Sequence, residues 1–123
     1  MLAKFIPERI RERYGLVLIK EIDIVIDASG FKYSDQWGKD VCIELAESCK
    51  RWKNNGTKVI LLPQAFGPFM SKSNQKSIRK ALKCANLIFA RENMSYEHLK
   101  NLVGEPSNLK IAPDFTNLIQ GII

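Results

Sequence analysis

The segment from Val59 to Phe69, VILLPQAFGPF, constrains the fold of this chain more than any other. It begins with an uncharged apolar run, breaks at Pro63 into a short loop rich in glycine and proline, and leads into a polar helical pattern from about Ser71. A buried strand, a tight loop and a helix in that order are typical of a ligand-binding turn in an open α/β sheet. We therefore expect this loop to lie at an edge of a sheet where ligands bind.

The same strand–loop–helix pattern recurs along the chain and predicts the fold class. The expected helices span residues 5–14, 37–54, 72–84 and 94–102, and the expected strands span residues 22–27, 58–62, 87–90 and 109–112. Their alternation predicts an α/β protein with a three-layer, Rossmann-like open sheet of about four mainly parallel strands and helices on both faces. With 123 residues, the chain 1–123 is expected to form a single domain.

Composition and charge exclude several classes of protein. The formal net charge is +6, but the densest basic segment, Lys72–Lys80, has no interleaved aromatic residues and is interpreted as a solvated helix face. We therefore expect no nucleic-acid partner. No apolar run approaches the roughly 18–20 residues of a membrane helix, and the charged N-terminal stretch does not resemble a secretory signal. The sequence thus predicts no transmembrane segment and a cytoplasmic location.

The cysteines and the single histidine give no sign of a metal site. Cys42, Cys49 and Cys84 contain no C-x-x-C pair, so they are interpreted as small buried thiols. His98 lies inside an expected helix and is interpreted as a surface or packing residue. The chain also lacks a G-x-G-x-x-G fingerprint and a Walker-type phosphate loop. We therefore predict no metal and no cofactor.

Candidate functional residues follow the expected strands. Ligands of open α/β sheets bind beyond the carboxyl ends of the strands. Four groups of polar or loop-forming residues are expected there: Ser29, Gly30, Tyr33 and Asp35; Gln64, Phe66, Gly67 and Pro68; Arg91, Glu92 and Ser95; and Asp114.

Arg91 is the most informative of these residues. It ends one strand and directly precedes a helix, where a guanidinium and the free N–H groups of the helix together attract a carboxylate or phosphate. The alternative is a structural salt bridge to Glu92, Asp35 or Asp114, and position alone does not separate the two interpretations.

The other candidates also have two interpretations each. Asp35 is a candidate catalytic base, but local sequence favours a helix cap, with Ser34 or Asp35 capping the helix that follows. Asp114 is a second candidate catalytic residue or a group that ties down the end of its strand. Gly67 lets backbone approach a ligand or simply forms a tight turn.

The ordered set of motifs resembles the polysaccharide pyruvyl transferase family. The motifs are SGF at 29–31 with YSDQWG at 33–38, LPQAFGPF at 62–69, ARE at 90–92 with SYE at 95–97, and APDF at 112–115. The resemblance implies transfer of a pyruvyl group from phosphoenolpyruvate to a sugar of a cell-surface or exopolysaccharide. It implies that Arg91 binds the carboxylate or phosphate of the donor, and that Gln64–Pro68 line a cleft between two Rossmann-like domains.

The chain is short for that family, and the second domain has no counterpart in it. We therefore expect a fragment of a longer two-domain enzyme, active only in the full-length context, with a missing second domain or a homo-oligomer as partner. The alternative is a non-catalytic α/β remnant that binds an anion or a partner protein. A response-regulator-like module is a third interpretation, but the paired acidic residues it needs after the first strand are absent.

Overall fold

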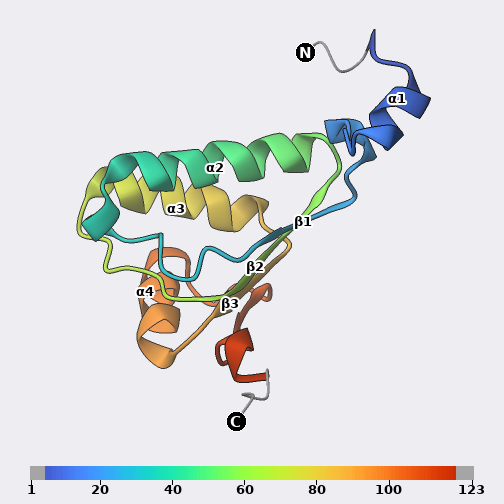
Figure 1. Cartoon of the computed structure of the whole chain (residues 1–123). Coiled ribbons are helices and arrows are strands. Elements are labelled where there is room, and N and C mark those ends of the chain that lie inside the picture. The colour runs from blue at the N-terminus through green and yellow to red at the C-terminus, as the bar shows by residue number, and fades with distance from the viewer. Residues whose placement is uncertain (1–4, 119–123) are drawn as a thin grey trace.

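The computed structural model describes residues 5–118 as a four-stranded parallel sheet with helices between the strands (Figure 1). Neighbouring strands follow one another in the chain, so the spatial order is β1-β2-β3-β4. The strands are β1 (Ile24–Asp27), β2 (Lys58–Gln64), β3 (Leu87–Ala90) and β4 (Leu109–Ile111). The Rossmann-like α/β fold predicted from the alternation of elements is confirmed.

The helices also follow the sequence prediction closely. The α-helices are α1 (Glu8–Arg13), α2 (Lys39–Asn54), α3 (Lys72–Cys84) and α4 (Asn93–Val103), and the short 3₁₀ turns are η2 (Ile19–Glu21), η3 (Asp35–Trp37) and η4 (Phe115–Leu118). The bounds of α3 and β3 agree residue for residue with the expected ranges, because each is bounded by clear turn residues and has a strong apolar period.

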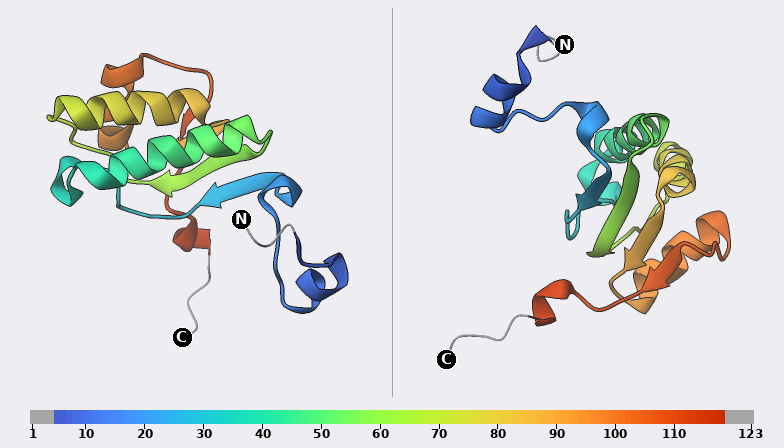
Figure 2. Two further views of the ribbon diagram at one scale, coloured as in Figure 1. Left: turned by 90° about the horizontal axis from the view of Figure 1, so that it is seen from above. Right: turned by 90° about the vertical axis from the view of Figure 1, so that its right-hand side faces the viewer.

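The helices cover one face of the sheet, which differs from the expected cover on both faces. Helices α2, α3 and α4 all lie on the same side of the strands (Figure 2). Each step moves to the next strand in the same direction, and crossovers of the usual right hand then place α2, α3 and α4 on the same face. On the opposite face Ile24 and Ile26 are 51% and 58% exposed.

The core lies between this covered face and the helices. Helix α2 contributes Cys42, Leu45 and Cys49, and α3 contributes Ile78, all of them buried. Burial raises the pKa of the Cys42 thiol to about 11, and burial together with nearby Cys84 and Asp27 raises that of Cys49 to about 12. The prediction of buried thiols is confirmed for Cys42 and Cys49, whereas Cys84 is half-buried.

The start of α2 differs from the prediction. Its N-cap residue is Gly38, and no side chain caps the helix. The prediction that Ser34 or Asp35 would cap this helix is therefore wrong. The turn η3 separates both residues from α2, and the Asp35 carboxylate instead contacts the first turn of α3.

Thr57 joins the segment before β1 to the loop between α2 and β2. Its hydroxyl donates to the Ile22 carbonyl at 2.7 Å and accepts from Asn55 Nδ2 at 2.8 Å, and the residue is 3% exposed. We expect Thr57→Val to lower the free energy of unfolding by about 1–2 kcal/mol, because it leaves the half-buried Ile22 carbonyl without its donor. Urea denaturation measures this loss, with the exposed Ser107→Ala as control; equal midpoints for the two variants would contradict the role of Thr57.

Candidate functional site

The loops after β1 and β2 are joined to each other at the carboxyl ends of the strands. Tyr33 and Phe66 form a parallel bridge, and their rings stack with centroids 6.1 Å apart. Ala65 N donates to the Gly30 carbonyl at 2.9 Å, and Gly67 N donates to the Tyr33 carbonyl at 2.8 Å. Two of the predicted groups therefore form one connected surface, as expected for neighbouring parallel strands.

Arg91 lies between two carboxylates at the ends of β3 and β4. Its Nε donates to Glu92 Oε2 at 3.2 Å, and its Nη1 donates to Asp114 Oδ2 at 3.4 Å. The side chain of Arg91 is 35% exposed. The salt bridges to Glu92 and Asp114 allowed by the sequence are thus present. The remaining guanidinium N–H groups have no hydrogen-bond partner among residues 5–118 and are able to contact an anion.

Asp114 is held on both oxygens. Thr116 donates to its Oδ1 from the backbone N at 3.0 Å and from the hydroxyl at 2.9 Å, while Oδ2 faces Arg91. The two bonds from Thr116, reinforced by Arg91, outweigh desolvation and lower the pKa of this carboxyl below its usual 3.8. Asp114 is therefore a carboxylate at neutral pH.

Ser95 connects the Arg91 network to the loop after β2. Its hydroxyl donates to Glu92 Oε1 and accepts from the backbone N of Phe66 at 2.8 Å. Ser95 is 2% exposed, so these bonds are formed away from water. Phe66 thus contacts both Tyr33 and Ser95, and it links the first three predicted groups.

Gln64 is the most unusual of the predicted residues. It is 0% exposed, its carbonyl accepts from Arg91 N at 3.0 Å, and the β2–β3 register shifts between Leu61 and Gln64. Neither atom of its side-chain amide has a hydrogen bond within the described residues. A buried amide without partners is unfavourable by roughly 1–3 kcal/mol, and functional sites are where such groups are tolerated.

Asp27 is a candidate site residue that the sequence analysis missed. Its carboxylate accepts from Tyr33 Oη at 2.5 Å, from the Ser29 backbone N at 2.9 Å and from the Ser29 hydroxyl. Burial and the bond to Asp27 raise the pKa of Tyr33, so its phenol stays protonated. An acidic residue at the end of the apolar run Ile24–Ile26 was the available signal.

Asp35, Gly67 and Pro68 lie on the side of the loop that faces the helices. Asp35 Oδ2 accepts from the backbone N of Ser71 at 2.9 Å, and its Oδ1 accepts from Asn74 Nδ2 at 2.6 Å. The Pro68 carbonyl accepts from Asp35 N at 3.1 Å. None of the hydrogen bonds of the described residues joins Asp35 to Arg91 or Asp114, so the structure does not bring the two predicted catalytic carboxylates together through contacts.

Two findings on the described residues concern metals and membranes. Among residues 5–118, no group of three or more His, Cys, Asp or Glu side chains is arranged to hold a metal ion. Within the same range, no helix combines the length and apolar character needed to cross a membrane.

Comparison with known proteins decides the family. A family model described as polysaccharide pyruvyl transferase matches residues 2–123. The chain belongs to this family. No curated protein and no solved structure gives a match. The family match covers both the Arg91 network and the joined loops after β1 and β2, so both belong to a polysaccharide pyruvyl transferase fold.

Proposed function

We propose that this chain binds the donor of a pyruvyl transferase, phosphoenolpyruvate, and takes part in transferring its pyruvyl group to a sugar of a cell-surface or exopolysaccharide. The observation that carries the proposal is Arg91, which lies at the carboxyl ends of β3 and β4 with part of its guanidinium open to solvent. Membership in the pyruvyl transferase family supplies the reaction class.

The chemistry of the donor suits this position. Phosphoenolpyruvate carries a carboxylate and a phosphate, and a guanidinium forms two parallel hydrogen bonds with either group. Helix α4 begins at Asn93, so its first N–H groups add to the attraction for an anion. Glu92 and Asp114 hold Arg91 in place, and the donor would compete with Asp114 for Nη1.

The reaction needs acid–base assistance as well as anion binding. A ketal at the central carbon of the pyruvyl group takes two sugar hydroxyl oxygens, while the methylene carbon gains a proton and phosphate leaves. A carboxylate that accepts the hydroxyl proton assists this step, and cations stabilise the departing phosphate. The assignment of Asp114 or Asp35 to the base stays a prediction, as does donor or acceptor contact by Ser29, Gly30, Tyr33, Gln64, Phe66, Gly67, Pro68, Glu92 and Ser95.

The other wall of the cleft belongs to the same proposal. We propose that it comes from a second Rossmann-like domain or a second copy of the chain, and that the enzyme acts in the cytoplasm. One observation favours the alternative of a non-catalytic, partner-binding module: Ile24 and Ile26 expose apolar surface on the uncovered face of the sheet.

Titration with phosphoenolpyruvate tests the donor site. We expect saturable binding by calorimetry and a roughly tenfold or larger loss of affinity in Arg91→Ala, because a charge-assisted hydrogen bond contributes about 1.5–3 kcal/mol. Arg91→Lys should recover part of the loss, since it keeps the charge but not the fork. The matched control is Arg51→Ala on the exposed side of α2, where Arg51 lies over the Trp52 ring. Absence of saturable binding, or equal affinity in Arg91→Ala, would contradict the assignment of Arg91 to the phosphoenolpyruvate site.

A further inference from the structure

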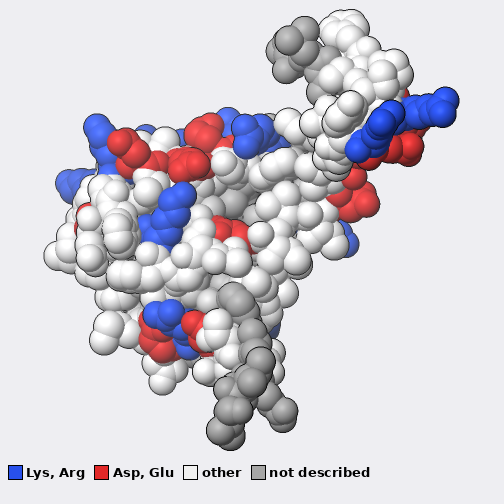
Figure 3. All heavy atoms as spheres, in the orientation of Figure 1, with Lys and Arg blue, Asp and Glu red and all other residues white. Residues whose placement is uncertain are grey.

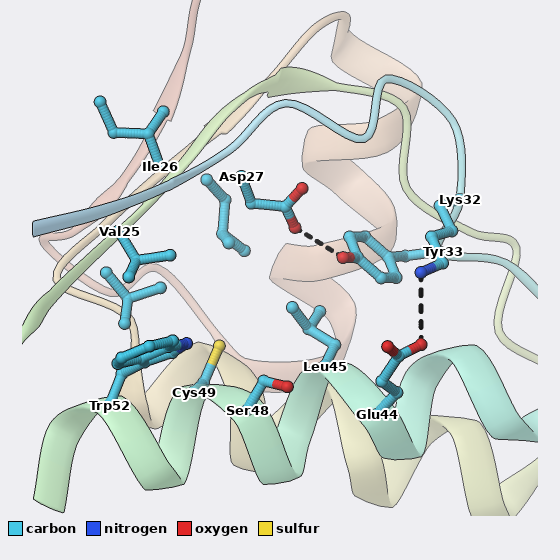
Figure 4. A pocket seen from close by; sticks show the side chains of 12 residues that line it. Val25, Ile26, Asp27, Lys32, Tyr33, Glu44, Leu45, Ser48, Cys49 and Trp52 are labelled. Carbon is cyan, nitrogen blue, oxygen red and sulfur yellow. Dashed lines mark hydrogen bonds and ion pairs between the residues drawn. The ribbon is translucent and has the colours of Figure 1, made fainter. Parts of the chain in front are cut away.

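A pocket that does not include Arg91 lies between β1 and α2 (Figure 4). Its volume is about 250 Å³. The lining comes from four places: strand β1, strand β2, one face of α2, and the loop after β1. The lining includes Asp27, Tyr33, Glu44, Ser48, Trp52 and Leu61.

One side of the pocket is apolar. Val25 and Leu61 face it from the sheet, and Leu45 and Trp52 face it from α2, with Ser48 between them on the same helical face. Leu45, Ser48 and Trp52 are three to seven positions apart on α2, which places them in one row along the helix. The apolar side is therefore suited to a compact hydrocarbon group.

The other side of the pocket is acidic. The Asp27 carboxylate is oriented by Tyr33 Oη at 2.5 Å and by the backbone N of Ser29 at 2.9 Å. At the rim, Lys32 Nζ lies 3.3 Å from Glu44 Oε2, so the lysine charge is balanced by Glu44 and not by Asp27. Acidic atoms are visible inside the hollow beneath α2 in Figure 3. The charges of Asp27, Glu44 and Lys32 together give the pocket one net negative charge.

We propose that this pocket binds a small organic cation, a primary ammonium attached to a compact apolar body. The ammonium would donate to Asp27 Oδ2 and to the Ser48 hydroxyl, and the apolar body would lie against Leu61 and Trp52. A volume of about 250 Å³ equals roughly eight water molecules, so a ligand of about six to eight non-hydrogen atoms fits. Asp27 and Glu44 repel an anion, which separates this site in chemistry from Arg91.

Fluorescence of Trp52 provides a direct test. The chain has two tryptophans, and Trp37 is 52% exposed and packs edge-on against Phe31, away from the pocket lining. Trp37→Phe therefore leaves Trp52 as the only tryptophan. We expect 3-methylbutylammonium to change the Trp52 emission saturably, the isosteric 3-methylbutan-1-ol to bind roughly tenfold more weakly, and isovalerate not to bind.

Variants in the Trp37→Phe background assign the charge. Asp27→Asn keeps an acceptor for Tyr33 and is expected to weaken ammonium binding roughly tenfold while leaving the alcohol unchanged. Glu47→Gln is the matched control, because Glu47 is an exposed carboxyl of α2 outside the pocket lining, and it should change the affinity less than twofold. Ser48→Leu fills the pocket and should abolish binding of both probes, which keeps the test decisive if Asp27→Asn does not fold.

The outcomes also separate this proposal from the donor site. Equal affinity for ammonium and alcohol, or ammonium binding that Asp27→Asn leaves unchanged, would overturn it. Saturable binding of D-glucose without any response to ammonium would assign the pocket to a sugar and overturn it as well. Because phosphoenolpyruvate binding at Arg91 is measured independently, failure of either proposal leaves the other standing.

Discussion

Gly67→Ala is expected to lower the free energy of unfolding by about 3 kcal/mol, a large part of the roughly 5–15 kcal/mol that stabilises a typical domain. Two effects add at this position. Gly67 has φ of 82°, where any residue with a Cβ is strained by about 1–2 kcal/mol. An added Cβ would also lie 2.9 Å from Cδ2 and Cγ of the His98 ring on α4, and overpacking of this kind is unfavourable by about 1–3 kcal/mol.

The chain contains a matched control for this prediction. Gly56 has nearly the same φ, 83°, but nothing lies within 4 Å of the position of its Cβ. Gly56→Ala therefore reports the backbone strain alone, and we expect a loss of about 1–2 kcal/mol in urea denaturation.

A double-mutant cycle then isolates the steric part. His98→Ala removes the ring, so Gly67→Ala should be less destabilising in that background than in the native chain. If Gly67→Ala and Gly56→Ala are equally destabilising, the close approach of the loop to His98 makes no contribution. The contact also gives His98 the packing role that its position in the sequence suggested.

Asp35→Ala is the second large effect, and we expect it to lower the free energy of unfolding by about 2–4 kcal/mol. The carboxylate accepts hydrogen bonds from the backbone N of Met70 and of Ser71, at the start of α3, and from Asn74 Nδ2 in its first turn. Each of the two backbone hydrogen bonds contributes about 0.5–1.5 kcal/mol, and a buried amide left without its acceptor adds about 1–3 kcal/mol. Asn74 is 2% exposed, so its amide has little access to water.

The contribution of Asp35 should depend on pH in a defined direction. Burial raises the pKa of this carboxyl, but the hydrogen bonds from Ser71, Asn74 and Met70 outweigh burial and hold it below the ordinary value of 3.8. The unfolded chain therefore binds more protons between the two pKa values. The stabilisation is fully present well above pH 3.8 and is lost as the pH falls from there through the folded pKa.

Chemical denaturation at several pH values checks both statements. The stability difference between the native chain and Asp35→Ala should be constant at neutral pH and shrink below about pH 4. Asp40→Ala is the control, because Asp40 is an exposed carboxyl in the first turn of α2. A stability difference that grows on acidification would contradict the assigned role of Asp35.

The candidate site was predictable to the extent that it depends on strand ends. Several of the predicted residues follow the carboxyl ends of the four strands, and the structure joins them in connected networks, as expected for neighbouring parallel strands. These residues are Ser29, Tyr33, Phe66, Arg91, Ser95 and Asp114. Asp27 was missed because it ends a strand instead of following one. The partners of Asp35 are Ser71 and Asn74, which lie 36 and 39 residues away, so no local pattern identifies them.

The sequence by itself determined the elements, their order and the family, because apolar period and turn residues act over a few positions and the motifs are linear. Only the tertiary structure decided which face the helices cover, since that depends on the order of the strands and the hand of every crossover. It also decided that Asp35 binds the backbone entering α3, that Arg91 lies between Glu92 and Asp114, and that His98 contacts Gly67. Each of these depends on contacts between residues distant in the chain or on side-chain orientation, which the packing of the elements fixes and local propensity does not.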